Sequence, residues 1–102
     1  MTSMGHVCVK PLLSEEDVAQ LLAATEGWRH EDAALVKDFR FTAAPIALAF
    51  IQRLGAAAER LNHHPNVEWF KREVRVTLSS RKSGGLTAQD AALARACDEA
   101  AI

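Results

Sequence analysis

The residues best suited to chemistry form one short run, Glu59-Arg60-Leu61-Asn62-His63-His64-Pro65. If a helix persists to residue 63, Glu59 and His63 lie four residues apart on one helix face, where the carboxylate can orient the imidazole. Pro65 forces His64 into an extended conformation, so His64 points elsewhere. Because histidine titrates near neutral pH, two imidazoles in different surroundings can divide the roles of proton donor and proton acceptor. The run therefore predicts acid–base chemistry at a helix end.

The same run also has a purely structural interpretation, which periodicity alone favours. A glutamate and a histidine would then form a surface pair, with a histidine near the negative end of a helix. A metal site is less well supported, because adjacent histidines cannot ligate one ion from the same helix face. Zinc would need further ligands that only His6, His30 or a distant cysteine could supply. We therefore expect no metal.

The elements that position this run follow from the spacing of apolar residues. The pattern predicts a helix over residues 14–24, strands over 28–31 and 35–41, a helix over 45–63, strands over 67–70 and 74–79, and a last helix from residue 87. This α-β-β-α-β-β-α order is typical of a two-layer α+β domain, with helices packed on one face of a four-stranded antiparallel sheet.

The helix over residues 45–63 should be the longest. Its apolar side chains recur at three- and four-residue spacing: Ile46, Phe50, Leu54, Ala58 and Leu61. Gly55 in its interior predicts close packing against another backbone, because glycine otherwise costs a helix about 1 kcal/mol relative to alanine.

Composition and charge exclude several classes of protein. The 102 residues have a formal net charge of -1 with no basic patch, so neither a nucleic acid nor an anionic membrane is an expected partner. No apolar run approaches the roughly 20 residues of a membrane span, and the first residues lack a signal-peptide layout. We expect a single domain over residues 1–102 in the cytoplasm. Cys8 and Cys97 lie far apart without a CxxC motif and should be reduced and structural.

Beyond these patterns, the sequence resembles a known family. Glu59-x-x-x-His63-His64-Pro65, followed after two short strands by Gly84-Gly85-Leu86-Thr87-x-x-Asp90, resembles the pterin-4a-carbinolamine dehydratase family, also called DCoH-like. Upstream matches at Gly27-Trp28, Phe39-x-Phe41 and Phe50 extend the resemblance over about residues 14 to 100.

The resemblance implies an enzyme that removes water from 4a-hydroxytetrahydropterin, giving quinonoid dihydropterin for the recycling of tetrahydropterin. It implies a small-molecule pterin substrate and no cofactor, since dehydration transfers no electrons. His63 and His64 correspond to the catalytic histidines. The substrate-binding positions correspond to Glu59, Asn62, Ser79, Ser80, Arg81, Lys82 and Asp90.

Two positions depart from the family's pattern. A third histidine that the family usually carries falls on Arg81, whose guanidinium can donate hydrogen bonds but cannot accept a proton. A common aromatic position falls on Lys71, although Trp69 and Phe70 beside it could restore a stacking surface. These departures keep a second hypothesis open, a non-catalytic binding or assembly protein on the same fold.

Two further expectations concern Asp90 and the assembly. Asp90 follows Thr87 by three residues, so it could serve only as a first-turn acid at a helix start. Exposed strand edges and an alanine-rich last helix predict a homodimer or homotetramer.

Overall fold

A computed structural model describes residues 11–102 of the chain. The elements, in chain order, are α1 (Glu15–Ala24), β1 (Arg29–Glu31), β2 (Ala34–Arg40), α2 (Ala44–Leu61), β3 (Asn66–Phe70), β4 (Glu73–Leu78), the short 3-10 helix η2 (Arg81–Ser83) and α3 (Ala88–Ala100). The predicted order of helices and strands is confirmed. Within residues 11–102 no helix combines the length and apolar character that a membrane crossing needs.

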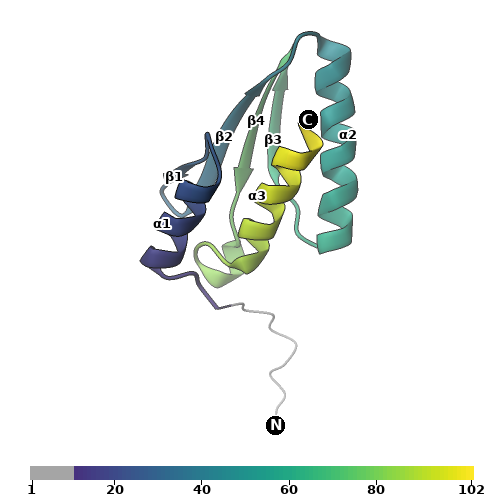
Figure 1. Cartoon of the computed structure of the whole chain (residues 1–102). Coiled ribbons are helices and arrows are strands. Elements are labelled where there is room, and N and C mark those ends of the chain that lie inside the picture. Colours follow the sequence, from purple (N-terminus) through teal and green to yellow (C-terminus); the bar gives the residue numbers. More distant parts are fainter. Residues whose placement is uncertain (1–10) are drawn as a thin grey trace.

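The pairing of β2 with β4 forms the centre of the sheet. The strand order is β1-β2-β4-β3, and all neighbours are antiparallel. Leu35 lies opposite Leu78, and Phe39 lies opposite Val74. All four side chains are buried against the helices, which cover this one face of the sheet (Figure 1). The predicted two-layer α+β architecture is therefore confirmed.

Capping boxes start both α1 and α3. In α1, Ser14 Oγ accepts from the Asp17 amide at 3.0 Å, and the Asp17 carboxylate accepts from the Ser14 amide at 3.3 Å. In α3, Asp90 Oδ2 accepts from the Thr87 amide at 2.9 Å. Such caps satisfy amides that have no partner within the helix. The cap of α3 also fixes the position of Asp90, which becomes important in the cleft described below.

The boundaries and packing of α2 differ from the prediction in three ways. The helix ends at Leu61 rather than at residue 63, because Asn62 adopts a left-handed conformation with φ 52°. Ile46, which was expected on the apolar face, is 46% exposed, and its neighbour Ala47 is buried in the core instead. A Cβ added to Gly55 would meet nothing within 4 Å, so the expected close approach of another backbone is wrong.

The alanine-rich last helix, α3, packs against α2 within the chain. Leu93, Ala94 and Cys97 are buried in the core. Burial raises the pKa of the Cys97 thiol to about 12, so the thiolate that reacts with electrophiles or oxidants is disfavoured. Cys97 is a free, buried cysteine, and Cys8 lies outside the described residues.

Candidate functional site

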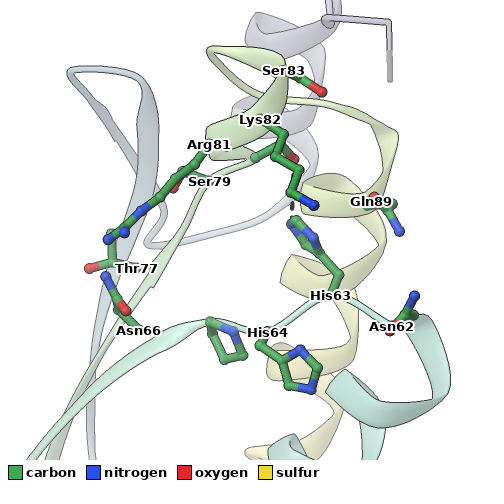
Figure 2. A pocket seen from close by; sticks show the side chains of 12 residues that line it. Asn62, His63, His64, Asn66, Thr77, Ser79, Arg81, Lys82, Ser83 and Gln89 are labelled. Atoms are coloured by element: carbon green, nitrogen blue, oxygen red, sulfur yellow. Dashed lines mark hydrogen bonds between the residues drawn. The ribbon is translucent and has the colours of Figure 1, made fainter. Parts of the chain in front are cut away.

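A polar cleft of about 600 Å³ opens between three parts of the chain. The end of α2 and the start of β3 form one side, the end of β4 and η2 form the other, and the first turn of α3 closes the base (Figure 2). Its size falls in the range of small-molecule sites. The cleft gathers seven of the nine residues that the sequence singled out: Asn62, His63, His64, Ser79, Ser80, Arg81 and Lys82.

His63 is held by a buried carboxylate beneath the cleft. Its Nε2 lies 2.6 Å from Asp90 Oδ1 and 3.5 Å from Ser80 Oγ. The Asp90 side chain is 0% exposed and that of His63 only 13%. A hydrogen bond from Nε2–H to the carboxylate leaves Nδ1 as the nitrogen that can accept a proton.

Asp90 connects the histidine to the start of α3. Its Oδ2 accepts from Ser80 Oγ at 2.7 Å and from the Thr87 amide at 2.9 Å. The Ser80 and Thr87 hydroxyls are themselves 2.9 Å apart. Asp90 therefore has the helix-start role that the sequence offered for it, and the same carboxylate contacts His63. Its side chain is 0% exposed and does not line the cleft, so direct binding of a substrate by Asp90 stays a prediction.

His64 has a different partner, and the predicted pairing of Glu59 with His63 is wrong. Glu59 Oε2 lies 2.7 Å from His64 Nε2, and both side chains are mostly exposed, at 77% and 59%. Side chains four residues apart face each other only where the backbone is helical at both residues. The helix α2 ends at Leu61, so His63 lies outside it. The left-handed turn at Asn62 instead directs His63 towards α3 and brings His64 within reach of Glu59.

Two cations extend over the cleft from η2. In Figure 2, Arg81 reaches towards Thr77 and Asn66, whereas Lys82 reaches towards His63. Within residues 11–102 neither side chain has a carboxylate partner. Arg81 thus lines the cleft, and its role in substrate binding stays a prediction.

Sequence reasoning missed four lining residues, Asn66, Thr77, Ser83 and Gln89. Asn66 and Thr77 are partners across β3 and β4 and point to the face of the sheet away from the helices. Gln89 Nε2 donates to the Leu61 carbonyl at 3.3 Å, joining α3 to the end of α2. Asn66 directly follows the His63-His64-Pro65 motif, which was a usable signal. Thr77 could be found only once the strand register was known.

The aromatic residues near Lys71 do not line this cleft. Lys71 lies in the turn between β3 and β4 with φ 57°, at the opposite end of these strands. Trp69 and Phe70 line a separate groove on the sheet. Within the described part of the chain, the expected stacking surface is therefore absent from the cleft. No group of three or more metal-ligating side chains gathers in residues 11–102 either.

Comparison with known protein families identifies the family of the chain. Residues 11–100 match the sequence model of the family described as pterin 4 alpha carbinolamine dehydratase. The chain belongs to this family. A Chloroflexus aurantiacus relative, named as a candidate pterin-4-alpha-carbinolamine dehydratase, is 39% identical over 89 residues, which cover 87% of this chain and 96% of the relative. A Nocardia farcinica relative with the same name is 38% identical over 90 residues, covering 88% and 95%.

Solved structures support the same family and fold. A Brucella melitensis protein described as a transcriptional coactivator/pterin dehydratase has a TM-score of 0.86 and 30% sequence identity, covering 90% of this chain and all of that one. A pterin dehydratase-like protein described as a RuBisCO assembly factor in the alpha-carboxysome has a TM-score of 0.63 and 28% identity, covering 74% and 90%. The family fold thus occurs in proteins with different described roles.

Proposed function

We propose that this protein dehydrates a 4a-hydroxytetrahydropterin to the quinonoid dihydropterin, with His63 and His64 moving the protons. Membership of the family and the names of the relatives support this activity. The structural observation that carries the proposal is the buried pair of Asp90 and His63 at the base of a polar cleft. A fixed imidazole with one nitrogen held by a carboxylate is a recurrent arrangement for a general base.

The reaction needs two proton movements and no electron transfer. The C4a–O bond breaks, a C4a–N5 double bond forms, the N5 proton leaves and the departing hydroxide takes up a proton to become water. Asp90 holds the Nε2–H tautomer of His63, so Nδ1 of His63 is suited to accept the N5 proton. His64 is exposed and can exchange protons with solvent, which suits it to protonate the leaving hydroxyl.

Other residues that line the cleft would bind the pterin. Hydroxyl and amide groups of Ser79, Asn62 and Asn66 line the cleft, where they can pair with the polar edge of a pterin ring. Ser80, Asp90 and Glu59 have a different role, because each of their side chains lies within hydrogen-bond distance of His63 or His64. We assign them to positioning the imidazoles.

The test is dehydration of chemically generated carbinolamine, followed spectroscopically with and without the protein. We expect the wild type to dehydrate the carbinolamine faster than the uncatalysed reaction. His63→Ala should lower the catalysed rate by at least about 10²-fold, which is the smallest contribution usually measured for one general acid or base. A wild type no faster than buffer would contradict the proposal. Arg72→Gln serves as the matched control, since Arg72 lies in the turn between β3 and β4, away from the cleft.

A second candidate function is assembly of other proteins without catalysis. It is favoured by Arg81, which replaces an imidazole with a group that cannot accept a proton, and by the structural neighbour described as an assembly factor. The same assay separates the two functions. A folded wild type that neither binds a reduced pterin nor accelerates dehydration would favour assembly.

We also propose that the protein is a cytoplasmic homodimer or homotetramer. All five residues of β3 are exposed, and this edge strand carries Val67, Trp69 and Phe70. An open edge with apolar side chains can pair with a second copy. Light scattering at micromolar concentration should give a mass at least twice the 11.1 kDa of the chain. A mass of one chain would contradict the assembly.

A further inference from the structure

We infer that the cleft selects a pterin whose side chain carries an anionic group, a phosphate ester or a carboxylate. This inference rests on the proposed function and adds the charge class of the substrate. It comes from the residues that line the cleft: Arg81 and Lys82 contribute permanent positive charge, and no aspartate or glutamate is among the lining residues. A cleft lined by one sign of charge concentrates ligands of the opposite sign.

The positive charge of these two residues is not cancelled locally. Elsewhere in residues 11–102, four cations have carboxylate partners, namely Arg29, Lys37, Arg40 and Arg75. Arg81 and Lys82 have none. Both are exposed at the cleft, where an incoming anion can reach them.

The nearby carboxylates do not offset this charge at the cleft surface. Asp90 lies beneath the floor, and its oxygens are covered by His63, Ser80 and the Thr87 amide. Glu59 is outside the lining and contacts His64. An anionic ligand in the cleft would therefore meet donors and cations rather than an open carboxylate.

The placement of the two cations assigns them different parts of the ligand. Lys82 points towards His63, near the proposed reacting atoms, whereas Arg81 extends towards Thr77 and Asn66 (Figure 2). The planar guanidinium can bind two oxygens of a phosphate or carboxylate at once, with more geometric selectivity than an ammonium group. We therefore assign the side-chain anion to Arg81. Arg81 would thus select for an anionic side chain, and a histidine at the same position would bind that anion more weakly.

The experiment compares three pterins by fluorescence titration of the full-length protein. The probes are 7,8-dihydroneopterin, its 3′-monophosphate and 6-carboxypterin, so that phosphate and carboxylate are distinguished. We expect the monophosphate to bind at least about tenfold more tightly than the neutral parent, with the ratio falling as ionic strength rises. Arg81→Gln should reduce the ratio to less than about threefold, and Lys82→Gln should lower it by a smaller factor. Arg72→Gln removes the same charge at the far end of β4 and should leave the ratio unchanged.

The outcomes separate this inference from the proposed function. Equal affinity for the neutral pterin and for both anionic pterins would overturn the charge preference and leave dehydration intact. A preference that survives Arg81→Gln would overturn the assignment to Arg81. If the folded protein bound none of the three pterins, the proposed function would fail and the inference with it. Tight binding of 6-carboxypterin but not of the monophosphate would restrict the class to carboxylates.

Discussion

His63 and His64 are neighbours in the chain but occupy opposite environments. His63 is 13% exposed and contacts a carboxylate that is 0% exposed, whereas His64 is 59% exposed and contacts one that is 77% exposed. The two hydrogen bonds have nearly the same length, 2.6 Å and 2.7 Å. The length of the hydrogen bond therefore does not distinguish the two pairs. They differ in the other contacts that each carboxylate makes.

Asp90 is part of the folded core, while Glu59 is a surface side chain. Asp90 joins η2, α3 and the end of α2 through Ser80, Thr87 and His63. The Glu59 side chain is hydrogen-bonded to His64, five residues further along the chain. An imidazole tied to such a network keeps one tautomer and one orientation, whereas a surface pair exchanges readily with water. The following predictions test that contrast.

The largest expected effect is on stability. Asp90→Ala should lower the free energy of unfolding by about 3 kcal/mol, because a buried hydroxyl, an amide and an imidazole all lose their acceptor. Glu59→Ala should change it by less than about 0.5 kcal/mol, as is usual for exposed pairs. Urea denaturation with a common slope for both variants measures the difference. Equal losses would show that the buried network has no special energetic role.

The second prediction concerns the histidines themselves. Either His63→Ala or His64→Ala should lower the dehydration rate by at least about 10²-fold, since each would remove a positioned acid or base. The stability cost should differ: about 2 kcal/mol for His63, which leaves Asp90 short of a donor, and below about 0.5 kcal/mol for His64. Rate assays and urea titrations on the same preparations give both numbers. Loss of activity that tracks loss of folding in both variants would argue for the structural interpretation.

The contrast between the two carboxylates also shows what sequence can predict. The element order and the sheet follow from apolar spacing, the start of α3 follows from Thr87 and Asp90, and all three are confirmed. That Glu59 contacts His64 and not His63 could not be predicted. Asn62 adopts the left-handed conformation and ends α2 at Leu61, so His63 is not helical and does not lie above Glu59 on the helix face. Burial of Asp90 depends on long-range packing of α3 against the end of β4, which periodicity does not specify.

The third prediction addresses Arg81, which faces the cleft from the other wall. Arg81→His should raise the dehydration rate of a neutral pterin by about tenfold, because it restores an imidazole that can transfer protons. This gain in rate should be smaller than that from an ideally placed base. Within the described residues no carboxylate is hydrogen-bonded to residue 81, so none would orient the imidazole of a histidine there. Initial rates at saturating carbinolamine measure the change. A slower variant would indicate that Arg81 itself contributes to the reaction.

The smallest expected effect concerns Asp38 and Arg75, a second exposed ion pair whose contribution to stability can be compared with that of Glu59 and His64. A hydrogen bond from Arg75 holds the pKa of Asp38 below its ordinary value of 3.8, and both side chains are about half exposed. Asp38→Asn should therefore cost about 0.5 kcal/mol at neutral pH. Because the folded-state pKa is lowered, this contribution is present above about pH 4 and disappears as the pH falls through the folded value. Urea titrations of both proteins at several pH values should show the gap closing in acid; a gap independent of pH would argue against the ion pair.

The most direct test of the contrast between the two pairs compares Asp90→Asn with Glu59→Gln in the carbinolamine dehydration assay. Both variants keep the size of the side chain and remove one negative charge. If the buried carboxylate fixes the tautomer and orientation of His63, Asp90→Asn should lower the rate by about 10²-fold or more, whereas Glu59→Gln should lower it by less than about fivefold. Circular dichroism confirms that each variant is folded before rates are compared. Equal effects, or a larger loss in Glu59→Gln, would contradict the central role given to the Asp90–His63 pair.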